Sequence, residues 1–238
     1  MRFIISSFTI MSMTIETFKK LKLPDCCGIY LFLNKQKKII YIGKATSLKD
    51  RVRSYFSPDL IQTRGKLLVK MHEEAHSIDF KPTDSVLEAL LLEADLIKKF
   101  RPAYNTKEKD DKSFNCVVVT KENFPQILVI RKKDLKSVTA RSVFGPFTNG
   151  AQLREALKIV QKIFPYRDSK CHLNSKRPCF NYTIGLCPGT CIGAIEKHCY
   201  EIRVKRIEKF LRGDIKGVLN ELERDMKKLA KEQKSKQQ

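Results

Sequence analysis

The chain has 238 residues, with 47 Lys and Arg against 26 Asp and Glu, and a formal net charge of +21. A positive excess of this size predicts a polyanionic partner, and nucleic acid is the leading candidate, although ribosomal and membrane-surface proteins share the same signature. No run of about 18 apolar residues occurs, which excludes a membrane-spanning helix. Eight cysteines in a Lys-rich chain favour a metal site in a reducing compartment over disulfides, and hence a cytoplasmic protein.

Two apolar, β-prone segments open the first predicted unit, after an extension over residues 1–20. Residues 28–33 read GIYLFL and residues 38–43 read KIIYIG, with a polar turn at 34–37 between them. This pattern predicts a β-hairpin. If Leu33 faces Lys38 across the four-residue loop, Tyr30 lies opposite Tyr41 on the same face of the pair.

Helix and strand signals then alternate up to residue 107. Ser47 and Asp50 form a Ser-x-x-Asp capping box at the start of a helix. A second helix is expected over residues 61–75 and a third strand over 77–81. A long helix, capped within residues 83–85, runs to Lys99 and ends before Arg101-Pro102. The sequence therefore predicts an α+β fold in which residues 21–107 form a β-β-α-α-β-α unit.

The rest of the chain reads as a second, mixed region. A charged linker at 107–113 precedes strand-like runs at 116–120 and 127–131, an FGPF turn at 144–147 and a helix at 151–164. Four cysteines cluster within residues 171–191, and helical stretches at 196–211 and 214–231 follow. We therefore expect residues 108–195 to hold linker strands, a helix and the cysteine cluster, and residues 196–238 to form a helical tail.

Glu93 is the most informative single residue of the long predicted helix. Projected at about 100° per residue, it falls in the middle of an apolar face formed by Val86, Ala89, Leu90 and Ile97. A buried carboxylate without a counter-charge is costly or becomes protonated, so Glu93 requires a cation. Periodicity favours a salt bridge to a nearby Arg, with a bound divalent metal as the alternative.

Other candidate residues have ordinary explanations when taken one at a time. Tyr30 and Tyr41 suit cross-strand packing, and Arg51, one turn before Tyr55, could decorate the surface. The clustered cysteines have the spacing C-x7-C-x7-C-x3-C, which suits an iron–sulfur cluster or tetrahedral Zn²⁺. The spacing lacks C-x2-C pairs and so favours iron–sulfur, and unligated thiols stay open. The remaining cysteines are expected to be small buried hydrophobes, namely Cys26, Cys27, Cys116 and Cys199.

The combined string of motifs narrows these alternatives. Gly28-Ile29-Tyr30 and Tyr41-Ile42-Gly43 spell the two halves of a GIY-YIG motif. The stretches YIGKATSLKDRVRSYF, ALLLEADLIKKFRPAYN, DDKSF, FGPF and RPCFNYTIGLCPGTCIG follow in order. Over residues 21–226 the chain resembles the N-terminal part of the UvrC family, with its GIY-YIG endonuclease domain and cysteine-rich region. Cys27 departs from the Pro usual in that family.

The resemblance implies a role for each matched position. Tyr41 would be the general base or water activator with Tyr30 beside it, Arg51 would stabilise the charge on the scissile phosphate, and Glu93 would be the single protein ligand to Mg²⁺ or Mn²⁺. A phenol titrates near 10, so we expect nearby cations and the metal to lower the pKa of Tyr41. Three further positions would hold phosphate or orient the tyrosines: Lys44, Tyr55 and Asn105. The expected DNA contacts are Lys44, Arg51, Arg53 and Lys112.

The resemblance also implies a [4Fe-4S] cluster, with Zn²⁺ as the alternative, on four cysteines: Cys171, Cys179, Cys187 and Cys191. The implied activity is a structure-directed DNA endonuclease of nucleotide excision repair that cuts 3′ to a lesion. Its partners would be damaged duplex DNA and UvrB, with UvrA upstream. The alternatives are a GIY-YIG nuclease of another pathway and a non-catalytic DNA-binding module.

The tail resembles the first helix of a UvrB-binding hairpin that lacks its second helix. Its apolar stripe is therefore expected to lack cover within the chain and to bind UvrB weakly. The stripe consists of Val218, Leu222, Met226 and Leu229.

Overall fold

The structure is a computed structural model that describes residues 21–57, 65–106 and 114–235. The described chain forms two compact units. The first contains the residues up to 116 together with 131–133 and 145–150, and the second contains 117–130, 134–144 and 151 onwards. Helices and strands occur in both units, which confirms the predicted α+β class. The expectations for residues 1–20, for Lys112 and for most of the linker lie outside the described residues.

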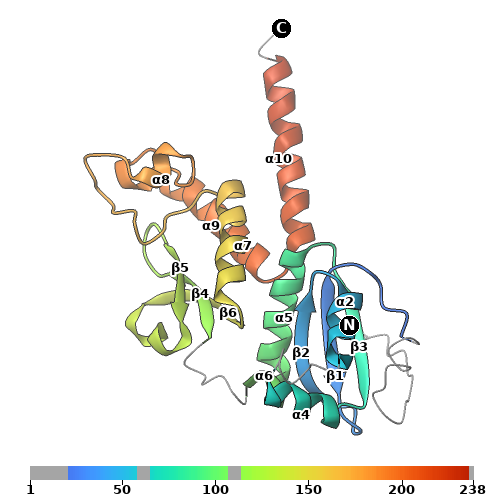
Figure 1. Ribbon diagram of the computed structural model, residues 1–238. Coiled ribbons are helices and arrows are strands. Elements are labelled where there is room, and N and C mark those ends of the chain that lie inside the picture. The colour runs from blue at the N-terminus through green and yellow to red at the C-terminus, as the bar shows by residue number, and fades with distance from the viewer. Residues whose placement is uncertain (1–20, 58–64, 107–113, 236–238) are drawn as a thin grey trace. The chain divides into compact units, whose positions relative to one another are not determined.

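The first unit is built on a three-stranded antiparallel sheet with strand order β2-β1-β3. The strands are β1 (Gly28–Leu33), β2 (Ile39–Ala45) and β3 (Ser77–Pro82). Helix α5 (Val86–Phe100) covers one face, and α2 (Leu48–Arg53) covers the other (Figure 1). Because β1 lies in the middle, β2 is an edge strand, and one side of its backbone does not pair with any described strand.

The predicted hairpin is confirmed, but its predicted register is wrong by two positions. Tyr30 pairs with Gly43, and Tyr41 pairs with Phe32. A β-bulge between Phe32 and Leu33 accounts for part of the shift. A shift of two keeps every side chain on its predicted face, so Tyr30 and Tyr41 still share one face as diagonal neighbours, with ring centroids 6.2 Å apart.

The turn explains the rest of the shift. The backbone of Asn34 pairs with that of Lys38 across three residues, instead of four, and Lys37 adopts a left-handed φ of 58°. The Asn34 side chain accepts hydrogen bonds from the backbone N–H groups of Gln36 and Lys38, at 3.1 and 3.0 Å. A short polar side chain that closes its own turn in this way is a local device that strand patterning does not reveal.

The helix starts of the first unit follow their capping signals. Ser47 Oγ accepts a hydrogen bond from the N–H of Asp50 at the start of α2, and Ser85 Oγ accepts one from Glu88 at the start of α5. A short 3-10 turn, η1 (Ser54–Phe56), extends α2. Helix α5 ends at Arg101, which has a left-handed φ of 44°.

Three details of this unit differ from the predictions. Helix α4 (Lys66–Glu74) is observed within the predicted 61–75, whose beginning lies outside the described residues. A short helix, α6 (Ala103–Thr106), follows Pro102 and was not predicted. Val86 is 45% exposed, so it does not belong to the buried face around Glu93. As the first residue of α5, it lies at the margin of that face.

The second sheet contains β4 (Asn115–Thr120), β5 (Ile127–Arg131) and β6 (Ala140–Phe147), in the order β5-β4-β6. The prediction of an FGPF turn is wrong because this segment is the end of β6, and it contains a cis Gly145–Pro146 bond. Both of its phenylalanines, Phe144 and Phe147, are buried. Gly-Pro is a typical turn dipeptide, and only the packing of its neighbours identifies it as strand here.

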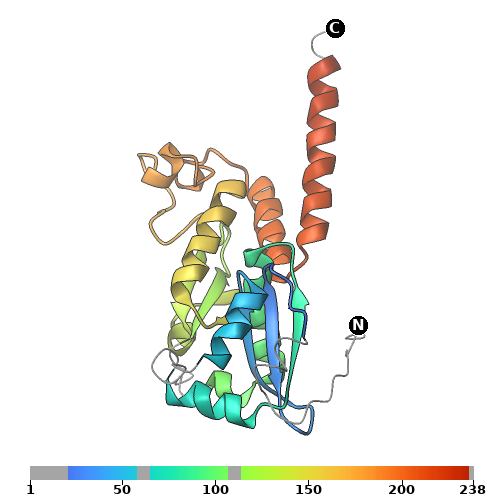
Figure 2. The same cartoon turned by 45° about the vertical axis from the view of Figure 1, so that its right-hand side comes forward.

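The remaining helices lie wholly or mostly in the second unit. They are α7 (Gly150–Ile163), α8 (Phe180–Thr183), α9 (Lys197–Leu211) and α10 (Ile215–Ser235), with short 3-10 turns η3 (Lys132–Ser137) and η4 (Thr190–Ile192). Helix α7 runs beside the second sheet in both views (Figures 1 and 2). The buried carboxylate of Glu208 in α9 accepts hydrogen bonds from Arg141 and Ser142 of β6, at 2.9 and 2.6 Å. These contacts attach α9 to the sheet.

Helix α10 only partly matches the expected uncovered stripe. Val218 is buried, contrary to the prediction, whereas Met226 and Leu229 are 69% and 60% exposed. Val218 lies near the start of α10, where the helix packs on α9 through ion pairs of Arg206 with Glu221 and Asp225. None of the described helices has the length and apolar character needed to cross a membrane.

Candidate active site and metal centre

The two halves of the GIY-YIG motif meet through Tyr30 and Gly43. A Cβ placed on Gly43 would overlap the hydroxyl and Cζ of Tyr30 and would lie 3.0 Å from its Cε1. The Tyr30 side chain, which is fully buried, therefore crosses β2 directly over the glycine. The position requires glycine because the phenol ring occupies the space of a side chain.

Tyr30 is the centre of a polar cluster on the α2 face of the sheet. Its hydroxyl lies 2.9 Å from that of Tyr55, and it accepts a hydrogen bond from Arg51 Nε at 3.1 Å. The Tyr41 ring packs against both Tyr30 and Tyr55, with ring centroids 6.2 and 6.3 Å away. The structure thus brings together four of the residues predicted for catalysis. Tyr30 and Tyr41 come from the hairpin, Arg51 from α2 and Tyr55 from η1.

Burial dominates the acid–base properties of this cluster. Desolvation raises the pKa of Tyr41 well above its ordinary value; Tyr30 and Glu93 add to the rise, while Arg51 opposes it. The pKa of Tyr55 is raised for the same principal reason. The prediction that nearby cations lower the pKa of Tyr41 is therefore wrong for the protein without bound metal, because burial has the larger effect. The phenols of Tyr41 and Tyr55 are both neutral at pH 7.

Asn105 fixes the strand that carries Tyr41. Its Oδ1 accepts a hydrogen bond from the N–H of Ile42, and its Nδ2 donates one to the carbonyl of Ile42, both at 2.8 Å. The side-chain amide thereby takes the place of a neighbouring strand at the free edge of β2. Both polar side-chain atoms of Asn105 therefore bind the backbone of Ile42, the residue that follows Tyr41.

Glu93 lies on the α5 face of the sheet, and its carboxylate has cationic and hydroxyl partners. Its side chain is 6% exposed, and its Oε2 accepts a hydrogen bond from Lys44 Nζ at 2.7 Å. The Thr148 hydroxyl donates to the same oxygen at 3.3 Å. The predicted counter-charge is thus present, supplied by Lys44 and not by an arginine. Oε1 accepts no hydrogen bond from the described residues, so it can serve as a metal ligand.

Glu93 and the tyrosine cluster lie on opposite faces of the sheet, and each has a contact with a side chain of the edge strand β2. Lys44 and Tyr41 are three residues apart on β2, the edge strand, so side chains on its two faces can meet around the edge. The charge of Glu93 acts on Tyr41 strongly enough to contribute to its raised pKa. Arg53 is exposed at the end of α2 and makes none of the contacts described for this cluster.

The four clustered cysteines converge in the second unit. Their Sγ atoms all lie within 4.8 Å of one another, and Cys171 and Cys187 approach to 3.7 Å. Cys171, Cys187 and Cys191 are buried, and Cys179 is partly buried. Of the other cysteines, Cys116 is buried as predicted, whereas Cys199 is exposed and its predicted burial is wrong. Burial raises the pKa of Cys171 to about 12, and the neighbouring thiol of Cys187 adds to the rise. Burial acts in the same direction at Cys191, but hydrogen bonds from Cys179 and Cys171 outweigh it and lower the pKa of that thiol. A metal ligand must be in the thiolate form, so metal binding and loss of the thiol protons are coupled.

The sulfur separations bear on which metal group fits. A tetrahedral Zn²⁺ with bonds of about 2.3 Å holds its sulfurs roughly 3.8 Å apart, which is close to the Cys171–Cys187 distance. A four-iron cubane is larger than a single ion and holds its four thiolates further apart. The donor set suits either group. The observed separations favour a single ion, whereas the family resemblance favours iron–sulfur.

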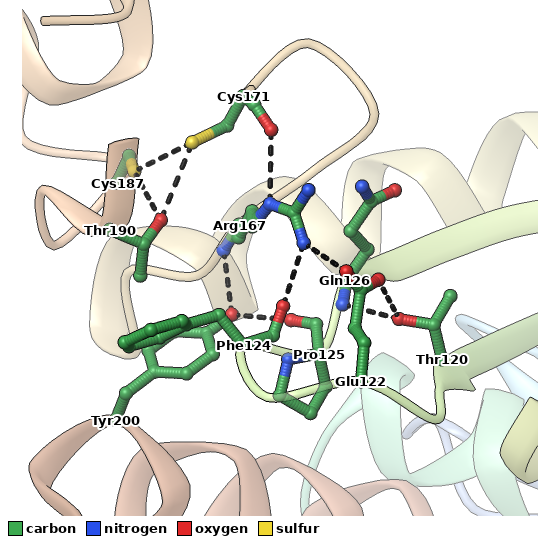
Figure 3. A network of polar contacts seen from close by, with 10 residues as sticks. All are labelled: Thr120, Glu122, Phe124, Pro125, Gln126, Arg167, Cys171, Cys187, Thr190 and Tyr200. Carbon is green, nitrogen blue, oxygen red and sulfur yellow. Dashed lines mark hydrogen bonds and ion pairs between the residues drawn. The ribbon is translucent and has the colours of Figure 1, made fainter. Parts of the chain in front are cut away.

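Arg167 connects the cysteine cluster to the body of the second unit (Figure 3). This buried guanidinium donates from Nε to the carbonyl of Cys171 at 3.0 Å, and from Nη1 to Glu122 and to the carbonyl of Phe124, at 2.6 and 2.8 Å. Its backbone N–H donates to the hydroxyl of Tyr200, which itself donates to the Pro125 carbonyl. The network holds the first cysteine against the β4–β5 turn and α9.

Sequence reasoning missed three residues of these sites. Thr148 follows the FGPF segment, and nothing in the sequence relates it to Glu93, 55 positions earlier. Arg167 looks like one more surface cation in a basic chain. Gly43 was quoted as part of a motif without a reason for its size, and only the paired register supplies that reason.

Comparison with known proteins identifies both units. The family model of the UvrC-like GIY-YIG domain matches residues 26–106, which places the first unit among GIY-YIG domains. The model of the UvrC/Cho excinuclease middle domain matches residues 114–210. The chain belongs to the UvrC family, as its motifs predicted. The match of the second region to a UvrC middle domain also separates this chain from GIY-YIG proteins of other kinds.

The curated relatives are similar over most of this chain. It is 38% identical over 208 residues to the UvrABC system protein C of Mesoplasma florum and 37% identical over 211 residues to that of Thermus thermophilus. These alignments cover 87% and 88% of the chain but 34% of each relative. The chain therefore spans about a third of the length of the curated relatives that it matches.

Solved structures match the first unit. The GIY-YIG N-terminal endonuclease domain of Thermotoga maritima UvrC, bound to its catalytic magnesium, is 40% identical. The match covers 40% of this chain and 100% of that domain, with a TM-score of 0.35. A variant of the same domain with one tyrosine replaced by phenylalanine, bound to its catalytic divalent cation, is 39% identical over 40% of this chain and 99% of its own, also with a TM-score of 0.35.

Proposed function

We propose that this chain is a metal-dependent DNA endonuclease of nucleotide excision repair that hydrolyses one phosphodiester bond on the 3′ side of a lesion. The observation that carries the proposal is the arrangement around β2. A buried carboxylate with one oxygen that no described residue binds, two basic side chains and three tyrosines gather at one edge strand. Membership of the UvrC family and the magnesium-bound Thermotoga domain support the same reading.

Binding of the scissile phosphate is assigned to Arg51 and Lys44. Arg51 is partly exposed and already oriented by its hydrogen bond to Tyr30, so its remaining N–H groups can face a phosphate. Lys44 can turn from Glu93 to the incoming phosphate when a divalent cation takes over the carboxylate. Mg²⁺ or Mn²⁺ held by Glu93 would supply Lewis-acid charge stabilisation at the reacting phosphate. Arg53 and Lys112 are proposed as further, sequence-independent contacts to the DNA backbone.

Tyr41 is proposed to orient and activate the attacking water. Because burial keeps this phenol neutral, it holds the water by a hydrogen bond in the resting site. Loss of its proton would require the positive charge of a divalent cation at Glu93 in addition to that of Arg51. Tyr30 and Tyr55 connect the same cluster to Arg51 by hydrogen bonds, and Asn105 keeps the Tyr41 strand in place. Thr148 donates to the Glu93 oxygen that Lys44 also binds, and it is assigned as a positioning residue for this carboxylate.

A nicking assay tests the assignment. Supercoiled plasmid is incubated with the full chain and Mg²⁺ or Mn²⁺, and the relaxed form is quantified. Glu93→Gln, Arg51→Ala and Tyr41→Phe should each reduce nicking by about 100-fold or more, while DNA affinity changes little because many cations share it. Two matched controls should cut normally: Asp95→Asn on the exposed side of α5, and Lys49→Ala beside Arg51 on α2. Nicking by the Glu93→Gln variant at the wild-type rate would remove the metal-ligand role.

The four cysteines are proposed to hold a structural metal centre. The supporting observation is the convergence of four sulfurs within 4.8 Å in a loop with little other core. Protein purified without oxygen should be brown and contain iron and sulfide if the group is iron–sulfur, because Zn²⁺ gives no such colour. A colourless protein with one zinc per chain would agree with the sulfur separations. A metal-free protein with four reduced thiols would end the proposal.

Damaged duplex DNA and UvrB are proposed as the partners. The net charge of +21 supports the first, and the name of the relatives as parts of a UvrABC system supports the second. The exposed Met226 and Leu229 on α10 are the proposed UvrB contact. Replacing both with Glu should abolish binding to immobilised UvrB and leave plasmid nicking unchanged. Binding that survives this change would place the interface elsewhere.

A further inference from the structure

The loop that carries the cysteines exposes a basic and apolar surface that the functions above do not use. This loop surface comprises five residues: Lys176, Arg177, Phe180, Tyr182 and Ile184. Phe180 is 76% exposed, the largest exposed fraction among the large hydrophobic residues described. Ile184 and Tyr182 are 48% and 39% exposed. A solvent-exposed aromatic side chain of this kind, next to other exposed apolar residues, often marks a surface that binds another molecule.

The charge around Phe180 has a single sign. From residue 169 to residue 195 the sequence contains no Asp or Glu, but it contains Lys170, Lys176 and Arg177. All three are exposed, and none forms an ion pair with a carboxylate among the described residues. The nearest preceding acid, Asp168, accepts a hydrogen bond from the Asn181 amide at 2.8 Å. The surface therefore suits a partner that is both anionic and able to receive an aromatic ring.

The backbone beneath this surface is held firmly. Asn181 accepts backbone hydrogen bonds from Leu186 and Cys187 at 2.7 and 3.0 Å, and the N–H of Tyr182 donates to the Cys179 carbonyl at 2.9 Å. Two cysteines of the metal-binding set, Cys179 and Cys187, thus flank the exposed segment on both sides. An aromatic side chain on a fixed loop can enter another molecule with little loss of conformational freedom.

We propose that the loop surface is a DNA-binding element in which Lys176 and Arg177 contact phosphates and Phe180 stacks on a base. Nucleic acid combines closely spaced negative charge with accessible aromatic faces, so it satisfies both features at once. The bases that Phe180 can reach are those that are unpaired or weakly stacked, as at a lesion or in a bubble. This inference rests on the proposed function, because it adds a second DNA contact remote in sequence from the residues of cleavage.

The absence of Trp from the chain makes a direct test possible. Phe180→Trp introduces a single tryptophan whose fluorescence is quenched when it stacks on a base. The probes are a duplex with a central unpaired bubble and the matching intact duplex, titrated without added Mg²⁺ or Mn²⁺ so that cleavage does not contribute. We expect the bubble duplex to quench the fluorescence of the Phe180→Trp protein strongly and the intact duplex to quench it weakly. Ile159→Trp, at an exposed position on α7, is the control and should be quenched little by either.

Two alanine variants separate stacking from charge. Phe180→Ala should weaken binding to the bubble duplex by about tenfold, with little effect on the intact duplex. Arg177→Ala should weaken binding to both duplexes and lower the slope of log affinity against log salt by about one. Lys136→Ala, an exposed cation on η3, should have a smaller effect. Metal content and thermal unfolding are measured for each variant, because lost metal would show that the loop itself had been damaged.

The outcomes distinguish this inference from the proposed function. If wild-type protein does not bind DNA, the proposed function fails. The loop inference alone is wrong under a different set of results. In that case wild-type protein binds and cuts DNA, the Phe180→Ala protein binds the bubble duplex as tightly as wild type, and the fluorescence of the Phe180→Trp protein is not quenched. If Phe180→Ala instead weakens binding to UvrB and leaves DNA binding intact, the surface belongs to a protein partner. Equal quenching of the Phe180→Trp and Ile159→Trp proteins would likewise refute a specific stacking contact.

Discussion

Replacing Gly43 by alanine tests the central packing of the candidate active site. The added methyl group would occupy the space of the Tyr30 hydroxyl and Cζ, so the ring must move. Overpacking a buried site costs about 1–3 kcal/mol. Moving the ring also breaks its hydrogen bonds with Tyr55 and Arg51, at about 1 kcal/mol each. We therefore expect Gly43→Ala to lower the free energy of unfolding by about 3–5 kcal/mol.

Urea denaturation followed by circular dichroism measures this change. Gly65→Ala is the matched control, because that glycine has a φ of +80° but no described atom within 4 Å of an added Cβ. Its ψ of 163° places it in a backbone region that is almost restricted to glycine, so backbone strain alone should cost the control about 1–3 kcal/mol. In a Tyr30→Leu background the methyl meets no phenol, so Gly43→Ala should cost much less there. A loss below about 0.5 kcal/mol, or an equal loss in both backgrounds, would refute the packing argument.

Three further predictions concern residues that hold the sites in place. Thr148→Val should raise the Mn²⁺ concentration for half-maximal nicking by about 3–10-fold with little change in the maximal rate, because Glu93 loses its hydroxyl partner. The control Thr148→Ser keeps a hydroxyl and should behave as wild type. Equal metal dependence of the two variants would contradict this role of Thr148. Asn105→Ala leaves the N–H and carbonyl of Ile42 without partners and should lower the free energy of unfolding by about 2 kcal/mol, with slower nicking; unchanged stability in urea would show that water replaces the amide fully. Cys187→Ser should release the bound metal, measured by elemental analysis, and lower the thermal midpoint of the protein by several degrees, whereas Cys199→Ser, at an exposed cysteine outside the cluster, should do neither.

The sequence allowed the local structure of the first unit to be predicted well, since its signals are local. Ser47 and Ser85 start their helices as capping residues do, and the alternation in GIYLFL and KIIYIG identifies two strands. The register was less accessible, because a β-bulge and a left-handed Lys37 depend on the geometry of the paired strands. β6 was missed because Gly145-Pro146 reads as a turn until the burial of the flanking phenylalanines is known.

For the candidate site, too, the sequence predicted local features but not contacts between distant residues. The periodicity of α5 correctly indicated that Glu93 is buried and needs a cation, but it could not identify Lys44 as that cation, because the two residues lie 49 positions apart. The shift in the pKa of Tyr41 was expected to be downward from the charges named in the sequence. Burial outweighs those charges, and burial is a property of the packed site. The contacts of Asn105 and Thr148 depend entirely on the tertiary fold.

The position of Tyr41 on an edge strand also bears on how this protein behaves at high concentration. An open strand edge can recruit a strand from another molecule. Asn105 already occupies the outward N–H and carbonyl of Ile42, so an intruding strand would have to displace it. One side-chain amide therefore fills the hydrogen-bonding positions that a strand from another molecule would need at this point of the edge.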